Sequence, residues 1–406
     1  MENKDELKRA IRSSMGSIKS GKELSDLFQE LFKETVQELL QAEMDEHLGY
    51  EKHAPTSNQF ANSRNGKSTK KVKTKYGLTE IQVPRDRDAS FSPQLLPKRR
   101  RVMEDIEDHV LSLYSHGMST RDIEDHIKEL YGVELSEASI SHITDRLIEH
   151  IEQWKSRRLE SVYMIVWMDA IVFKVRQDRK VIQKAVQIAV GLTNQGKKDL
   201  LGMWTCQHES ASFWMSVLTD LKSRGVEDIL ISSTDNLKGF TEAIKSVFPE
   251  TKTQVCMVHQ LRNSLKFVVW KDKKQVAAAL KEVYDAPDEP TAYQHLEAFQ
   301  AAWDKKYPYI AQSWKANWEN LATFFEFPVE IRKIVYTTNI IENINRIVRK
   351  YTKAKAAFTS DSAMEKAVYL ALMQVSRKWS MPQKNWPIML LQFINLFGQQ
   401  RCQIKI

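Results

Sequence analysis

Apolar residues recur at two different spacings along the chain, and each spacing predicts one kind of secondary structure. Leucines return every three or four positions in residues 23–48, and three shorter stretches between residues 102 and 155 repeat this spacing. A period of three to four is typical of helices that bury one face. The N-terminal part is therefore expected to be helical. The leucine face of residues 23–48 fits either an internal core or a dimer interface.

Near Val162 this spacing gives way to almost continuous apolar runs. Residues 162–175, 181–192 and 200–206 are strand-sized, rich in Val and Ile, and separated by short polar turns. Runs of this kind are typical of buried strands. A helix pattern, a run at 228–235, a second helix pattern and a run at 253–258 follow. This order predicts an α/β domain with a sheet of mixed strand direction.

The strand pattern stops at residue 271, tryptophans then lie in helical patterns up to residue 331, and helices resume after Thr338. A helical insertion therefore splits the α/β domain. We expect six segments along the chain. They are a helical or dimerisation segment at 1–50, a basic segment at 51–101, a helix-turn-helix domain at 102–155, the first part of the α/β domain at 156–270, the all-helical insertion at 271–331, and the second part of the α/β domain with C-terminal helices at 332–406.

The chain is mildly basic, with 60 Lys and Arg against 52 Asp and Glu and a formal net charge of +8. This excess favours a polyanionic partner only weakly, so its distribution matters more than its size. In residues 62–77 Lys and Arg alternate with small polar residues, and a block of four cations follows, Lys98, Arg99, Arg100 and Arg101. The region fits either a solvated linker or a segment that contacts DNA phosphates, because each neutralised phosphate releases a counterion.

The sequence has neither a secretion signal nor a run of membrane-spanning length. The first twenty residues are polar, and the longest apolar runs are strand-sized. The three cysteines, Cys206, Cys256 and Cys402, lie far apart and are odd in number, which does not favour a disulfide framework. We expect a cytoplasmic protein that has no membrane partner.

A helix-turn-helix pattern lies between the basic block and Val162. Ser119 and Ser136 each stand where a helix N-cap is expected, and Gly132 separates the two helices that they begin. In such a motif the second helix enters the major groove of DNA. Its exposed face would present Ser139, His142 and Arg146 to the bases. A helical bundle without a DNA role has the same pattern, but the basic block upstream favours DNA.

Three carboxylates stand out by their positions. Asp169 follows seven mostly apolar residues, where an unpaired charge is costly and needs a cation or dense hydrogen bonding. Asp235 ends the run at 228–235, and Glu342 lies on a helix four residues before Arg346. Taken singly, these acids fit a solvent-exposed strand end, an N-cap and an i,i+4 ion pair. Taken together, they form the smallest comfortable set for two divalent cations that share one carboxylate.

Two segments beside these acids carry a family resemblance. QVCMVHQLRNSLK at 254–266 and TTNIIENINRIVRKYTKAKAAF at 337–358 are similar to segments of the Mutator-like transposases of bacterial insertion sequences. The order of strands and acids resembles the RNase H-like fold of the DDE transposases. The resemblance covers essentially the whole chain. It implies that Asp169, Asp235 and Glu342 hold two Mg²⁺ or Mn²⁺ ions per active site and catalyse DNA strand cleavage and strand transfer.

The resemblance also implies partners. They are double-stranded DNA, as terminal inverted repeats and as target, and a second copy of the chain, which would form a homodimer in the DNA complex in the bacterial nucleoid. Cys256 and His259 belong to the family's signature, which implies a position near the active site, although a structural thiol and a core histidine remain alternatives. Zinc is not expected, because no second Cys/His pair lies at a suitable spacing.

Further DNA contacts are expected from the helices around the acids and from the insertion. Cations next to metal-bound acids favour phosphate contacts. In related transposases an aromatic residue of the insertion stacks on a flipped base, which Trp314 or Trp318 would do in this chain. The residues expected to contact DNA in this part are Cys256, His259, Arg262, Trp314, Trp318, Arg346, Arg349, Lys350 and Lys353.

Two other functions share much of this pattern. One is a catalytically inactive repressor derived from a transposase, and the other is a structure-specific nuclease of the same fold, such as a junction resolvase. A repressor has no need of three carboxylates at the place where DNA phosphates must lie. The long N-terminal region and the helical insertion favour a transposase over a nuclease, and strand joining would separate those two activities.

Overall fold

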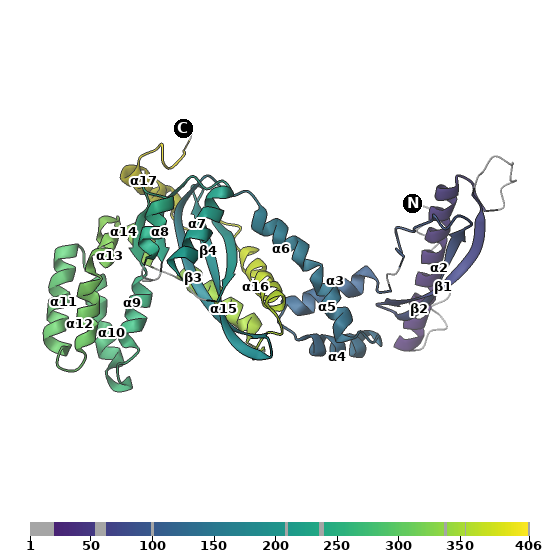
Figure 1. Cartoon of the computed structure of the whole chain (residues 1–406), viewed down its shortest axis with the longest axis horizontal. Helices are drawn as coiled ribbons and strands as arrows, with labels where there is room; N and C mark the ends of the chain where they lie inside the picture. Colours follow the sequence, from purple (N-terminus) through teal and green to yellow (C-terminus); the bar gives the residue numbers. More distant parts are fainter. Residues whose placement is uncertain are drawn as a thin grey trace. The chain divides into compact units, whose positions relative to one another are not determined.

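The computed structural model describes residues 20–52, 62–98, 101–207, 210–234, 239–336, 339–353 and 355–404. The chain forms two compact units, Met1–Arg146 and Leu147–Ile406, which are described one after the other (Figure 1). Among the described residues, no helix is both long and apolar enough to cross a membrane.

The first unit begins with the long helix α2 (Gly21–Leu48), as the leucine spacing predicts. The Ser20 hydroxyl accepts a hydrogen bond from the Glu23 N–H at its start, and Gly49 ends it in the left-handed conformation that favours glycine. Helix α2 packs on a hairpin of two antiparallel strands, β1 (Arg64–Thr74) and β2 (Gly77–Asp86). Buried residues of the helix, of both strands and of the loop after β2 form one core, Val36, Leu40, Val72, Ile81, Val83 and Leu96.

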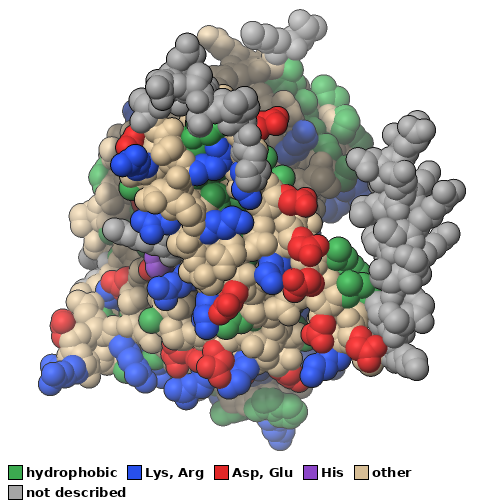
Figure 2. Space-filling view, turned by 90° about the vertical axis from the view of Figure 1, so that its right-hand side faces the viewer, with side chains coloured by type: hydrophobic (Ala, Val, Ile, Leu, Met, Phe, Trp, Pro, Cys, Tyr) green, Lys and Arg blue, Asp and Glu red, His purple; other side chains and the backbone are tan. Residues whose placement is uncertain are grey.

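Strand β1 corrects the interpretation of residues 62–77 as a solvated linker, whereas contact of this segment with DNA phosphates stays a prediction. Val72 and Thr74 are buried, whereas Lys67 and Lys71, which precede them, are exposed. The period-two pattern of a strand is therefore present, but polar residues occupy most of its inward positions. Figure 2, which views the right-hand side of Figure 1, shows Lys and Arg side chains interspersed with Asp and Glu side chains.

Three helices complete the first unit, α3 (Glu104–Ser115), α4 (Thr120–Tyr131) and α5 (Glu137–Asp145). Ser119 and Asp122 form a reciprocal capping box at the start of α4, and Ser136 caps α5. Both predicted N-caps are confirmed. Helix α5 ends at Asp145, and a separate helix begins at Leu147.

The second unit begins with that helix, α6 (Leu147–Ser156), and contains a five-stranded sheet. The strands are β3 (Val162–Gln177), β4 (Lys180–Thr193), β5 (Lys198–Cys206), β6 (Asp228–Thr234) and β7 (Lys252–Val255). Their order across the sheet is β5-β4-β3-β6-β7. Strands β3, β4 and β5 are antiparallel neighbours, and β6 and β7 run parallel to β3, so the predicted mixed sheet is confirmed.

Helices α7 (Ala211–Ser223) and α8 (Phe240–Val247) pack on one face of the sheet. Val166 and Met168 of β3 belong to the core on that face, together with Trp214 and Phe240. Because neighbouring residues of a strand point to opposite faces, Asp169 belongs to the other face. Helix α15 (Asn339–Thr352) reaches Asp169 there, and helix α16 (Asp361–Ser376) follows it in the chain.

Every element that the structure describes between β7 and α15 is a helix, and the expected helical insertion at 271–331 lies within this part. Its elements are α9 (Met257–Leu265), α10 (Trp270–Tyr284), α11 (Glu289–Trp303), α12 (Pro308–Ala316), α13 (Trp318–Ala322), the short 3-10 helix η1 (Thr323–Glu326) and α14 (Val329–Tyr336). Helices α10, α11 and α12 stand side by side at one end of the second unit (Figure 1). The chain continues past α16 into α17 (Trp386–Phe397).

Candidate active site

Asp169 is a buried carboxylate in the middle of β3, with a relative exposure of 6%. Its Oδ1 accepts a hydrogen bond of 2.8 Å from the N–H of Ala170. The side-chain amide of Asn345 donates to its Oδ2 from α15. His259 Nε2 of α9 lies 3.9 Å from Oδ1. Two helices that are distant in the sequence therefore converge on one strand carboxylate.

Glu342 reaches the same place from the first turns of α15. It lies three residues before Asn345, a spacing that puts two side chains on one face of a helix. Its Oε1 pairs with the guanidinium of Arg262, which lies three residues after His259 on α9. Residues of α9 therefore contact both Asp169 and Glu342, and α15 carries Glu342 and contacts Asp169.

Asp235, the third expected acid, lies outside the described residues. The strand that precedes it in the sequence is described. Trp167 of β3 and Ser233 of β6 are the last residues in parallel register, and each stands two positions before one of the two aspartates in the sequence.

A cavity of about 1160 Å³ opens beside Glu342 and Asn345. Arginine and lysine side chains line much of its wall, namely Lys198, Arg262, Arg346 and Arg349. Burial lowers the pKa of Lys198. Four cations around one described carboxylate make a site suited to an anionic ligand with several charges.

A second cavity, of about 650 Å³, continues along α15 past Arg346 and Arg349, which line both. Lys350 of α15 and Lys353, directly after this helix, line it as well, together with residues 171–173 of β3. The four cations that are expected to contact DNA in this part of the chain are therefore arranged along two adjoining cavities. The sequence did not single out Lys198, which stands in no motif, or Asn345, which lies in the segment around Glu342 but whose partner Asp169 is distant in the sequence.

The cysteine and histidine of the family signature occupy different surroundings. Cys256 is buried, and its N–H donates to the Thr234 carbonyl at 2.8 Å, which ties the start of α9 to the end of β6. Its burial argues against a direct contact with DNA. His259 lies beside Asp169, so its place near the acids agrees with what the resemblance implies. No group of three or more His, Cys, Asp and Glu with metal-binding geometry occurs among the described residues.

The two tryptophans expected to stack on a base also differ. Trp314 is fully buried in the core of the insertion, and its indole N–H donates to the Ser264 hydroxyl at 2.9 Å. This burial contradicts a base-stacking role for Trp314. Trp318 is half-buried, donates to Glu289 Oε1 at 3.0 Å and packs edge-on against Tyr293.

The expected DNA contacts of the first unit lie on its helices and in its basic segment. His142 is exposed on α5, Ser139 is half-buried beside the N-cap Ser136, and Arg146 is exposed but paired with Glu107. Lys98 and Arg101 are exposed, and the Lys98 ammonium donates to the Ala89 carbonyl at 3.0 Å. Arg99 and Arg100 lie outside the described residues.

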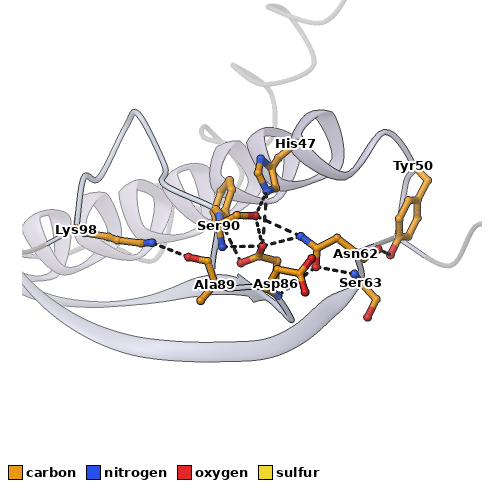
Figure 3. A network of polar contacts seen from close by, with 10 residues as sticks. His47, Tyr50, Asn62, Ser63, Asp86, Ala89, Ser90 and Lys98 are labelled. Atoms are coloured by element: carbon orange, nitrogen blue, oxygen red, sulfur yellow. Dashed lines mark hydrogen bonds and ion pairs between the residues drawn. The ribbon is translucent and has the colours of Figure 1, made fainter. Parts of the chain in front are cut away.

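A polar network holds the base of this segment around the buried carboxylate of Asp86 (Figure 3). Asp86 accepts hydrogen bonds from the Ser90 hydroxyl at 2.6 Å and N–H at 3.0 Å, from the Asn62 amide at 2.7 Å and from the Phe91 N–H at 3.2 Å. His47 Nε2 lies 3.6 Å away. Burial raises the pKa of Asp86, but the hydrogen bonds from Ser90 and Asn62 outweigh it and hold that pKa well below its usual range.

The fold and this arrangement of acids and cations agree with a family match. A model described as "Transposase, Mutator family" matches residues 1–382, so the chain belongs to the Mutator family of transposases, enzymes of DNA transposition.

Named relatives are transposases of bacterial insertion sequences. The chain is 40% identical over 375 residues to a probable transposase for an ISRM3-like element of Sinorhizobium fredii. The matched residues make up 92% of this chain and 93% of the relative. The same identity and coverage hold for the transposase of ISRM3 from Rhizobium meliloti. A solved structure of a simian T-cell lymphotropic virus intasome with a PP2A regulatory subunit matches 46% of this chain and 66% of the solved chain at 13% identity. Its TM-score of 0.19 is too low to carry an argument about the fold.

Proposed function

We propose that the second unit is the RNase H-like catalytic domain of a DDE transposase, in which Asp169, Asp235 and Glu342 hold two divalent metal ions for DNA strand cleavage and strand transfer. The convergence of Asp169 and Glu342 carries this proposal. They come from parts of the chain on either side of the helical insertion. Helix α9 nevertheless contacts both acids, Asp169 through His259 and Glu342 through Arg262, and Asn345 of α15 contacts Asp169. The sheet order β5-β4-β3-β6-β7, with one antiparallel half and one parallel half, supports the fold assignment.

The described residues fit Mg²⁺ or Mn²⁺. Asp169 is buried, and it accepts hydrogen bonds from two neutral donors, a backbone N–H and an amide. Glu342 is paired with an arginine, so this carboxylate already attracts a cation. Carboxylate oxygens are the ligands that these hard ions prefer. When bound, two such ions activate the attacking oxygen and stabilise the leaving oxygen of an in-line phosphoryl transfer.

The protein's own cations would hold the DNA strand. Lys198, Arg346 and Arg349 line the cavity around Glu342, where their side chains can bind phosphate oxygens on either side of the scissile bond. Asn345 would keep the Asp169 carboxylate in one orientation. Arg262 would exchange its contact with Glu342 for a DNA phosphate when a metal ion binds.

The remaining assignments extend the proposal to the whole chain. The first unit, with its capped helices α4 and α5, would bind the terminal inverted repeats through His142 and neighbouring residues. Two copies of the chain would be needed to hold two DNA ends in one complex. The six segments that the sequence predicts, including the insertion at 271–331, would be the domains of this transposase.

The test is a cleavage and joining assay with labelled DNA that carries the sequences flanking the gene. Wild type is compared with Asp169→Asn, Asp235→Asn and Glu342→Gln in Mg²⁺ or Mn²⁺, and with Glu319→Gln as a control that removes an exposed acid of α13. We expect cutting and joining at the repeat end by wild type and the control, and loss of both in the three variants with DNA binding retained.

Each other outcome points to a named alternative. Wild-type protein that binds the ends but never cuts or joins them would be a repressor. Cutting without joining would favour a structure-specific nuclease. Equal cutting by wild type and the three variants would refute the assignment of these acids.

A further inference from the structure

Three large apolar side chains are exposed to solvent in the turn between α9 and α10 and at the first residue of α10. Phe267 is 70% exposed, Val269 is 53% exposed and Trp270 is 89% exposed. Trp270 is the most exposed large apolar side chain in the described part of the chain. A single exposed apolar residue needs no explanation, but three of them within four positions of the sequence indicate a binding surface.

The backbone of this turn is held firmly, so the exposure of Trp270 is a property of the folded turn. Val268 is buried in the core of the insertion. The Val269 N–H lies 3.4 Å from the Tyr307 hydroxyl, and that hydroxyl donates to Asp272 at 2.6 Å. The Asp272 N–H in turn donates to the Val269 carbonyl at 2.9 Å. A binding surface on such a turn is preorganised.

Positive charge surrounds the aromatic side chains. Four exposed lysines lie within residues 266–274, namely Lys266, Lys271, Lys273 and Lys274. The one acid of this stretch, Asp272, is buried and paired with Lys306. Among the described residues, no carboxylate forms an ion pair with any of the four lysines. The surface is therefore apolar at its centre and cationic at its margin.

We propose that Phe267 and Trp270 form a contact for DNA with an unpaired base, on which the Trp270 ring stacks while the flanking lysines bind the adjacent phosphates. Aromatic rings beside cations are the combination that binds single-stranded DNA without base specificity, because every base has a stacking face. A partner protein would need an acidic surface to match these lysines, whereas DNA supplies negative charge along its whole length. The inference rests on the proposed function only in taking DNA as the substrate.

The position of the turn connects this contact with the active site. Helix α9 carries His259 and Arg262 beside the two described acids and ends at Leu265, directly before the turn. From His259 to the end of α9 the helix axis rises roughly 9 Å, which corresponds to about three nucleotides of one DNA strand. A strand cut at the acids can therefore continue along α9, with an unpaired base a few nucleotides away at Trp270.

Binding of the full chain to two labelled DNAs in EDTA tests this contact without any chemistry. One DNA is a blunt duplex of the element end, and the other is the same duplex with a four-nucleotide unpaired tail that contains 2-aminopurine. The variants are Trp270→Ala, Trp270→Phe and Phe267→Ala. Leu391→Ala is the matched control, because it removes another apolar side chain that is 62% exposed in the same unit.

We expect Trp270→Ala to raise the Kd for tailed DNA about tenfold and to leave the Kd for blunt duplex within about twofold. Quenching of 2-aminopurine fluorescence should disappear in this variant and return in Trp270→Phe, while Leu391→Ala behaves as wild type. Wild-type affinity of Trp270→Ala for both DNAs, or an equal loss on both, would overturn the proposal. So would a change of oligomeric state without DNA, which would assign the surface to a second copy. The cleavage test of the three acids is independent, because Asp169→Asn should bind both DNAs as wild type does.

Discussion

The side-chain amide of Asn345 donates a hydrogen bond to Oδ2 of Asp169 and so joins α15 to the sheet across 176 positions of sequence. Oδ1 of the same carboxylate accepts the Ala170 N–H. Because Asn345 lies less than one helical turn after Glu342, the turn that carries one acid also orients the other. Support of this kind fixes a metal ligand before the metal binds. Asn345 is therefore a positioning residue for the proposed site.

Replacing Asn345 should weaken catalysis while leaving DNA binding intact. In Asn345→Ala we expect cleavage to fall about tenfold to a hundredfold and the Mg²⁺ concentration for half-maximal activity to rise, because Asp169 loses its fixed orientation. In Asn345→Asp a second carboxylate beside Asp169 should raise the pKa of the pair and move the acidic limb of the pH–rate profile to higher pH.

Metal titrations and pH–rate profiles of the purified full chain measure both effects. Asn320→Ala, at an exposed position outside the site, is the control. A structural role alone would lower activity without changing the metal requirement or the pH profile. Wild-type values of both in the two Asn345 variants would contradict the positioning role.

Removal of the arginine beside Glu342 should change two properties in opposite directions. In Arg262→Gln the site loses a cation, so divalent ions should bind more tightly and half-maximal activity should need less Mg²⁺. The same change should weaken DNA binding and reduce the slope of log Kd against log salt by about one, since one phosphate contact is lost. Stability should change by only about 0–1 kcal/mol, because the Arg262 side chain is 61% exposed.

The comparison for this variant is Arg377→Gln, which removes an exposed arginine at the end of α16. Metal titration of cleavage and salt-dependent binding in EDTA give the two readouts separately. An unchanged metal requirement together with unchanged DNA affinity would show that Arg262 is only a surface cation.

The network around Asp86 predicts acid sensitivity of the first unit. Because the pKa of Asp86 is lower in the folded chain than in the unfolded one, its carboxylate stabilises the fold at neutral pH. This contribution should begin to be lost as the pH falls below about 4, where the unfolded carboxyl takes up a proton. Asp86→Asn should cost about 1–3 kcal/mol at neutral pH, since an amide nitrogen cannot accept the hydrogen bonds of Ser90 and Asn62.

Thermal unfolding followed by circular dichroism between pH 3 and pH 7 measures this dependence. Asp88→Asn is the matched control, because Asp88 is an exposed neighbour of Asp86. The variant Asp86→Asn should have a flatter dependence on pH than wild type. Parallel curves for wild type and Asp86→Asn would remove Asp86 as the source of acid sensitivity.

Most of the sheet could be predicted from the sequence because its strands are buried on both faces. Such strands consist of nearly continuous apolar residues, as in β3 and β4, and continuous runs of that length are easy to recognise. Strand β1 was not predicted, because one of its faces is solvated and its inward positions include Ser68, Lys70 and Thr74. A strand that buries mostly polar residues has no apolar alternation to detect.

The candidate site could be predicted in part. Asp169 and Glu342 were found from a buried charge and a family resemblance, and the structure brings them together. The contacts that connect them could not be found, because the Asn345–Asp169 and Arg262–Glu342 pairs join residues far apart in the sequence. Only the folded chain places such pairs side by side.

The choice between Trp314 and Trp318 shows the same limit and yields a last prediction. Their spacing of four residues would put both on one face of a continuous helix, but α12 ends at Ala316 and α13 begins at Trp318. The break sends Trp314 into the core and leaves Trp318 half-buried. Trp314→Ala should therefore cost about 3–5 kcal/mol of unfolding free energy through the cavity that it leaves. Trp318→Ala should cost less, because its side chain keeps partial contact with solvent. Urea unfolding of both variants decides this, and a larger loss for Trp318→Ala would mean that the two helices pack differently.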